Sequence, residues 1–336
     1  MAEHKTSGGD TETDIFSERT QLKPYEYTDF LDYKDAIRNS YWVHTEFNFS
    51  GDVQDFKVNT TPAEKTVIKR TMLAIAQIEV QVKTFWSDIY EEMPKAEIGS
   101  VGMTFAESEV RHMDAYSHLL DVLGITEDFE QVTEVPAIKN RIEYLDECLK
   151  STQSEDKEEY VMNILLFSMF VEHVSLFSQF LIMTSFDKYE KKFKGISNAV
   201  EATSKEEQIH GLFGVELVDT IRDENPDLFD DAFEAEIQEA CQQAYEAEMD
   251  ILDWIFHEGE LEFLPREHID EFLKGRFNQS LENVGVNPLF ETDDDLLDET
   301  RWFDEDIMMT KDNDFFSKRS TTYNKHTQSV TAEEMF

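Results

Sequence analysis

The chain has 336 residues, and 73 acidic residues against 30 basic ones give it a formal net charge of −43 at pH 7. Such an excess of negative charge repels nucleic acids and anionic membranes, so we expect neither as a partner. Hydrophobic residues make up 40 % of the chain, which excludes wholesale disorder, and 12 Gly and 7 Pro indicate long helices. Two cysteines and a polar N-terminus predict reduced thiols, no signal peptide and a cytoplasmic protein.

The N-terminal part of the chain has little regular pattern. Residues 1–20 are polar and are predicted to be flexible, and residues 21–58 hold short aromatic-rich pieces that include Trp42. A helix-start signal follows, with Thr61 at the N-cap and Glu64 closing a capping box. We predict one helix from this point to about residue 93, with Glu79 beside its apolar stripe.

Apolar residues at helical spacing predict further helices along the chain. One carries Glu109, His112 and Tyr116 and ends before Gly124, and another carries Glu207 and His210. Period-two alternation is missing over any useful length, so very little strand is predicted. The predicted helices cover approximately residues 101–123, 127–150 with an interruption at Pro136, 161–186, 197–222, 226–257 and 266–284.

The most apolar stretch is residues 161–186, with Glu172 near its middle. No Lys or Arg occurs between Glu158 and Asp187, so Glu172 lacks a basic partner on its own helix. An unpaired buried carboxylate costs several kcal/mol, which leaves a proton, a partner from another helix or a metal. The stretch is long enough to span a membrane, but its central Glu favours a buried core helix.

One pattern occurs twice: a lone Glu followed, one helix later, by Glu-x-x-His. The two members of a Glu-x-x-His pair share a helix face and can bind one ion. Two such halves facing each other would form a dinuclear site in a four-helix bundle, and carboxylates with imidazole suit manganese or iron. The six predicted ligands are Glu79, Glu109 and His112 in the first half and Glu172, Glu207 and His210 in the second.

Each motif has a plainer alternative when it is taken alone. Glu-x-x-His is common by chance in so acidic a chain, and Glu79 could pair with Lys83 on a surface. Tyr116 could be an ordinary core tyrosine, and Trp42 a structural one. The repetition of the whole pattern, together with Glu172, favours the metal site.

These motifs resemble the radical-generating small (beta) subunit of class I ribonucleotide reductase, over roughly residues 25–285 and the tail. The resemblance implies a ferritin-like helical bundle at residues 21–288, with the six ligands named above. It matches EVRHMDAY to the segment with the radical-site tyrosine, Tyr116, and EEQIH to a ligand motif preceded by an acid, Glu206. It implies that Trp42 passes an electron to the metal site.

The resemblance also gives roles to the acidic tail, residues 289–336, which we expect to be flexible. Tyr323 would relay the radical between subunits, and the last residues, through Phe336, would dock onto the catalytic large subunit. The implied assembly is a homodimer, and a small activating flavoprotein is a further implied partner.

Two departures bear on the metal. The best-known family members carry Asp where this chain has Glu79, and also where it has Glu206. The longer first ligand resembles the manganese-using subclasses, which favours a dimanganese or manganese–iron centre over di-iron. The radical could then reside on Tyr116 or on the metal pair.

Three other functions compete with this interpretation. A diiron or dimanganese oxygenase or desaturase would use the same ligands on an organic substrate and would not need Tyr323. An iron-storage protein would be much shorter and would gain nothing from the tail. A purely structural acidic helical protein would leave Glu172 unexplained.

Overall fold

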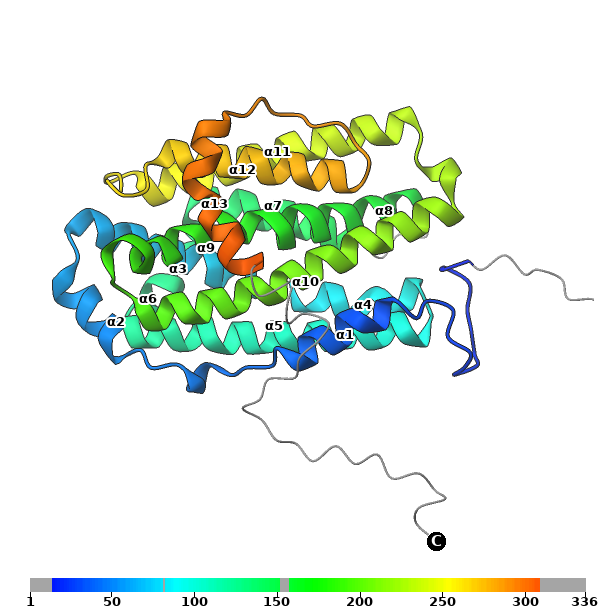
Figure 1. Ribbon diagram of the computed structural model, residues 1–336, viewed down its shortest axis with the longest axis horizontal. Helices are drawn as coiled ribbons and strands as arrows, with labels where there is room; N and C mark the ends of the chain where they lie inside the picture. The colour runs from blue at the N-terminus through cyan, green and yellow to red at the C-terminus, as the bar shows by residue number, and fades with distance from the viewer. Residues whose placement is uncertain (1–13, 81, 152–156, 309–336) are drawn as a thin grey trace, which may run out of the picture.

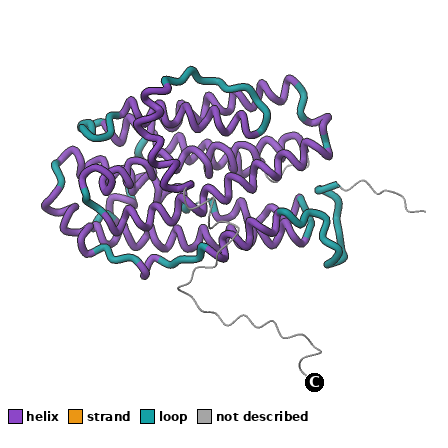
Figure 2. The backbone as a smooth tube through the Cα atoms, viewed as in Figure 1, coloured by secondary structure: helices purple, strands orange, loops and turns teal. Residues whose placement is uncertain are grey.

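The structure is a computed structural model that describes residues 14–80, 82–151 and 157–308. Within these ranges loops connect helices, no strand is present, and the only β-type pairing is an isolated bridge between Leu261 and Leu264 (Figures 1 and 2). The predicted all-α bundle is therefore confirmed. The α-helices are α1 (Phe30–Asn39), α2 (Ser50–Gln54), α3 (Pro62–Ile78), α4 (Lys83–Glu92), α5 (Ala96–Leu123), α6 (Thr126–Phe129), α7 (Pro136–Ser151), α8 (Lys157–Leu165), α9 (Leu176–Ser185), α10 (Lys194–Glu224), α11 (Asp231–Phe256), α12 (Arg266–Asn283) and α13 (Asp294–Met308).

Helix α3 begins at the predicted capping box but ends much earlier than predicted. The Thr61 hydroxyl accepts from the Glu64 backbone N–H at 3.2 Å, and the Glu64 carboxylate accepts from the Thr61 N–H at 2.6 Å. The helix stops at Ile78, and α4 starts at Lys83, so the prediction of one helix to residue 93 is wrong. The apolar pattern continues across the break because α4 also buries one face, and neither Gly nor Pro marks the break.

The apolar stretch forms one long helical rod with widened turns. It consists of α8, a π-helical segment η4 (Leu166–Ser175), α9 and a second π-helical segment η5 (Phe186–Glu190). By length and hydropathy residues 157–190 could cross a membrane, but every residue of the apolar window is buried inside the protein. The expectation of a core helix is confirmed.

Four helical segments form the centre of the bundle. Helices α3, α5 and α10 and the η4–α9 rod contact one another, and α1 and α4 cover α5 on the outside. Helices α7, α11 and α12 pack on the other side of the rod, and α13 lies across α12 (Figure 1).

Both ends of the described chain are more ordered than expected. Ile15 is fully buried and Arg19 pairs with Glu97 of α5, although residues 1–20 were predicted to be flexible. Residues 294–308 form α13, although flexibility was predicted from residue 289. The acidic composition of this segment concealed its amphipathic spacing: Phe303 and Ile307 lie one turn apart and are both buried, while most of the acidic residues are exposed.

Candidate metal centre

The six predicted ligands converge in the middle of the bundle. Each side chain is at most 1 % exposed, and they come from the end of α3, from α5, from η4 and from α10. Their ligand atoms fall into two groups, each within 4.8 Å, that share one carboxylate. The first group is Glu79, His112 and Glu207, and the second is Glu109, Glu172, Glu207 and His210.

Glu109 and Glu207 lie between the two imidazoles. The His112 Nδ1 atom is 2.9 Å from Glu207 Oε1 and 3.4 Å from Glu109 Oε2. The His210 Nδ1 atom is 2.9 Å from Glu109 Oε1 and 3.1 Å from Glu207 Oε2. Each of these carboxylates thus presents one oxygen to each histidine, as a bridge between two ions requires, while Glu79 and Glu172 lie at opposite ends.

Several fully buried atoms of this cluster form no hydrogen bond of acceptable geometry among the described residues, although some of them approach one another as ion pairs. They include both carboxylate oxygens of Glu79 and of Glu109, Glu207 Oε1 and His112 Nδ1. Buried polar atoms almost always form hydrogen bonds, so a group of them that point at each other without doing so indicates a further partner between them. Two divalent cations would supply that partner, and the donor set fits hard transition metals such as manganese and iron.

The cluster is electrostatically unfavourable as a set of free side chains. Burial raises the pKa of Glu172 well above its ordinary value, and the charges of Glu207 and Glu109 raise it further. Burial likewise raises the pKa of Glu79. Burial alone would lower the pKa of His112 and His210, but the surrounding carboxylates outweigh it and raise both. Burial would also raise the pKa of Glu207, but its hydrogen bond with Glu172 and the two imidazoles outweigh burial and lower it. Divalent cations at this position would compete with protons for the same ligand atoms.

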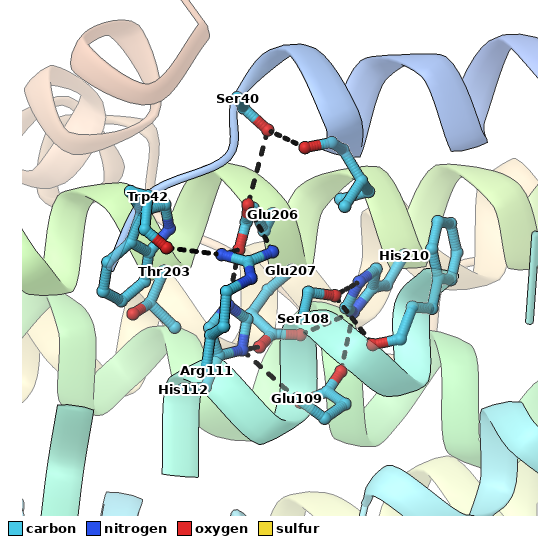
Figure 3. A network of polar contacts seen from close by, with 12 residues as sticks. Ser40, Trp42, Ser108, Glu109, Arg111, His112, Thr203, Glu206, Glu207 and His210 are labelled. Atoms are coloured by element: carbon cyan, nitrogen blue, oxygen red, sulfur yellow. Dashed lines mark hydrogen bonds and ion pairs between the residues drawn. The ribbon is translucent and has the colours of Figure 1, made fainter. Parts of the chain in front are cut away.

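Outer partners fix the rings of both histidines. The His112 Nε2 atom is 2.8 Å from Glu206, which can only accept, so Nε2 carries the proton and Nδ1 faces the cluster (Figure 3). The His210 Nε2 atom is 3.0 Å from the Ser108 hydroxyl, which itself donates to the Phe105 carbonyl. Both rings thus direct an Nδ1 lone pair to the centre.

Arg111 joins this outer layer and was missed by the sequence analysis. Its guanidinium donates to both oxygens of Glu206 at 3.1 Å and to the Trp42 carbonyl at 3.1 Å (Figure 3). Trp86 was missed too: its indole N–H donates to Glu172 at 3.0 Å. Arg111 lies next to a predicted ligand within the quoted motif, which was a usable signal, whereas nothing local in the sequence pairs Trp86 with Glu172.

Trp42 and Tyr116 lie on the His112 side of the cluster. The Trp42 ring stacks on the His112 ring with centroids 5.8 Å apart, and its indole N–H has no partner among the described residues. A cavity of about 280 Å³ lies beside it, lined by Ser40, Trp42, Asn198, Glu201, Ala202 and Lys205. Tyr116 is buried, and burial and the Glu79 carboxylate both raise the pKa of its phenol. Tyr323 and Phe336 lie outside the described residues.

A helical bundle with a buried cluster of carboxylates and imidazoles defines the class of ferritin-like proteins with a dinuclear metal site. Residues 19–296 match the family model described as the small chain of ribonucleotide reductase. The chain belongs to this family, whose members work with a large subunit.

Two relatives are distant in sequence but align with nearly the whole chain. A probable ribonucleoside-diphosphate reductase small subunit of Invertebrate iridescent virus 3 is 24% identical over 93% of this chain and 86% of its own length. The ribonucleoside-diphosphate reductase subunit beta of Chlamydia pneumoniae is 22% identical over 90% of this chain and 89% of its own.

Solved structures share the fold at still lower identity. The ribonucleotide reductase R2 subunit from Clostridium botulinum superposes with a TM-score of 0.75 at 16% identity, over 88% of this chain and 98% of that one. An R2-like ligand-binding oxidase with an aerobically reconstituted Mn/Fe cofactor gives a TM-score of 0.66 at 18% identity, over 79% and 95%. The ferritin-like fold is thereby confirmed.

Proposed function

We propose that Glu79, Glu109, His112, Glu172, Glu207 and His210 bind two metal ions and that this centre starts ribonucleotide reduction in the large subunit. The observation that supports the proposal most is the position of Glu109 and Glu207, each offering one oxygen to each imidazole. When bound, the metal pair supplies a one-electron oxidising equivalent.

The side chains around the site orient the proposed ligands and shield them from water. Glu206 keeps His112 in one tautomer, and Arg111 holds Glu206 in place by two parallel hydrogen bonds. Phe105 and Trp86 pack against His210 and exclude water from that side, and Phe213 packs behind both of them. The Glu79 ligand and the manganese–iron cofactor of the similar oxidase favour a manganese-containing centre over di-iron.

We assign the electron path to aromatic side chains next to the cluster. Trp42 stacks on His112 and so connects the first metal position with the edge of the bundle. Tyr116 is the candidate for a stored radical, because its buried phenol lies in the field of the Glu79 carboxylate. Tyr323 in the tail completes the path to the large subunit.

The assembly we propose is a cytoplasmic homodimer that docks its tail, residues 289–336, on the large subunit, with a small flavoprotein as a further activating partner. Met103 and Val110 support the dimer: they lie two turns apart on α5 and are 56% and 42% exposed. Apolar side chains exposed on one face of a long helix suit contact with a second copy.

The relay is tested with Tyr323→Phe, which removes the phenol but keeps the ring. We expect normal metal content and a loss of turnover with the large subunit of at least about 100-fold, because Phe cannot be oxidised at that position. Tyr90→Phe, at an exposed tyrosine on α4, is the matched control and should keep full activity. Full turnover in the Tyr323 variant would refute the relay.

The home of the radical is tested by low-temperature EPR on protein that has been loaded with manganese, iron or both and then oxidised. A narrow organic signal that disappears in Tyr116→Phe would place the radical on the tyrosine. A broad manganese-hyperfine spectrum that is unchanged by the substitution would place it on the metals.

An oxidase acting on an organic ligand is the second candidate, since an R2-like ligand-binding oxidase shares the fold. Such an enzyme needs space for its ligand beside the metals, and the cavity beside Trp42 is lined by none of the six cluster residues. Removing residues 315–336 separates the two functions: a reductase subunit loses turnover with its large subunit, whereas an oxidase keeps its activity.

A further inference from the structure

Two side chains of α12 contact the backbone of the π-helical segment η4. Arg276 Nε donates to the His173 carbonyl at 3.1 Å, and the Ser280 hydroxyl donates to the Met169 carbonyl at 3.3 Å. The Ser280 oxygen also lies 3.0 Å from His173 Nδ1. Arg276 and Ser280 are one turn apart on α12, as His173 and Met169 are on η4. The two contacts therefore lie one turn apart along two helices that run in opposite directions.

The segment that α12 holds in this way carries Glu172. A π-helical turn is wider than an α-helical one and is rare, because its backbone hydrogen bonds are less favourable. Side chains from a neighbouring helix can stabilise such a turn by bonding to its carbonyls. His173 directly follows Glu172, so the bond from Arg276 reaches the residue next to the proposed ligand.

The same network reaches the helix that carries Glu207. Gln208, the next residue on α10, lies 3.2 Å from His173 Nε2 through its amide nitrogen, and its amide oxygen accepts from Arg276 at 3.5 Å. Gly211 allows the close approach of α10, since a Cβ there would lie 3.1 Å from the His173 side chain. Arg276 therefore contacts the sequence neighbours of two proposed ligands.

Arg276 is itself almost buried and depends on α13 for its counter-charge. It is 7% exposed, and its guanidinium lies over the rings of Phe177 and Phe272 at 3.8 and 5.3 Å. The partner carboxylate is Asp304 on α13, at 3.0 Å. A buried charge needs such a partner, so Asp304 fixes the guanidinium that in turn fixes η4.

We propose that Arg276 is a positioning residue of the metal centre, which holds the widened turn bearing Glu172, and that Asp304 on α13 holds Arg276 in place. The proposal rests on the ligand role of Glu172 proposed above. It concerns mainly one half of the centre, because Glu172, whose helical segment Arg276 contacts through His173, belongs only to the group with Glu109, Glu207 and His210.

The test is a titration of metal-free protein with manganese(II) alone, followed by metal analysis and EPR. Wild-type protein should take up about two ions per chain and show an exchange-coupled spectrum. In Arg276→Gln we expect one site to weaken by roughly 10- to 100-fold, the effect typical of lost outer-layer support. At limiting manganese this variant should show about one ion per chain and the six-line spectrum of an isolated ion.

Matched variants separate positioning from general damage. Asp304→Asn should weaken the same site, and Arg276→Lys should not restore it, since an ammonium cannot bond to His173, Gln208 and Asp304 as a planar fork does. Asp306→Asn removes a surface ion pair between α13 and Lys188, 3.7 Å long, and should leave both sites unchanged.

Each remaining outcome would overturn the proposal. Two manganese sites of wild-type affinity in Arg276→Gln would show that the position of Glu172 does not depend on Arg276. Equal weakening of both sites with a matching fall in Tm would show a purely structural role. A wild-type protein that binds no manganese, iron or mixture of the two would refute the proposed metal site itself, and the positioning role with it.

Discussion

At the scale of single residues, the side chains that would bind metal ions also lower the stability of the metal-free protein. Four carboxylates and two imidazoles are buried together, and burial raises the pKa of Glu172 and Glu79. Such a group destabilises the metal-free fold and binds metal ions for the same reason, because the ions remove the repulsion.

Replacing Glu172 by Gln tests whether this side chain destabilises the metal-free protein and binds metal. The amide keeps an acceptor for the Trp86 indole N–H and removes a carboxyl whose charged form burial disfavours. We expect the metal-free variant to be more stable than metal-free wild type by on the order of 1 kcal/mol, or about 2–4 °C in Tm. Added manganese should raise its Tm less than it raises that of wild type.

Thermal melts with and without manganese give the measurement, and Glu282→Gln on the exposed face of α12 is the control. An equal metal-induced rise in Tm for wild type and Glu172→Gln would contradict a ligand role for Glu172.

At the scale of elements, close helix packing places the second layer of the site. Gly102 of α5 lies against α4, where a Cβ would overlap the Trp86 carbonyl and the Ile89 side chain. Trp86 in turn donates to Glu172. The break after α3 allows α4 to approach α5 in this way, which a single straight helix from residue 62 to residue 93 would not.

Gly102→Ala should therefore destabilise the protein. We expect a loss of about 1–3 kcal/mol in the free energy of unfolding, since the methyl group meets backbone that cannot move independently. Gly51→Ala, in α2 with no atom within 4 Å of the added Cβ, should be neutral or stabilising by up to about 1 kcal/mol. Chemical denaturation of both variants decides the point, and equal stabilities would contradict the packing argument.

The N-terminal segment is tied to α5 by a charge pair that should be sensitive to pH. Burial alone would raise the pKa of Glu97, but Arg19 and the backbone N–H groups of Glu26 and Tyr27 lower it from 4.5 to about 2. Between these values the unfolded chain binds the proton more readily than the folded one. The pair therefore stabilises the fold fully above about pH 4.5, and this contribution disappears as the pH falls towards 2.

Glu97→Gln should lower the free energy of unfolding at pH 7 by on the order of 2 kcal/mol. The difference in the free energy of unfolding between wild type and variant should become smaller as the pH falls from about 5 to 3. Urea denaturation at several pH values measures this difference, and a difference that is constant over that range would refute the assigned cause.

At the scale of the whole molecule, the repeated ligand pattern made the fold class and the six-residue cluster predictable from the sequence. Spacing along a helix indicates which side chains share a face, and that is local information. The end of α3 at Ile78, the π-helical segment η4 and the folding of α13 were not predictable in this way. They depend on contacts between distant segments, such as Arg276 with His173 and Asp304.

Crystallographic anomalous scattering at the manganese and iron absorption edges, on metal-loaded protein, tests the central claim most directly. We predict two peaks inside the bundle, one among Glu79, Glu109, His112 and Glu207 and one among Glu109, Glu172, Glu207 and His210, with manganese in at least one of them. An empty cluster, or metal bound only elsewhere on the acidic surface, would contradict the account.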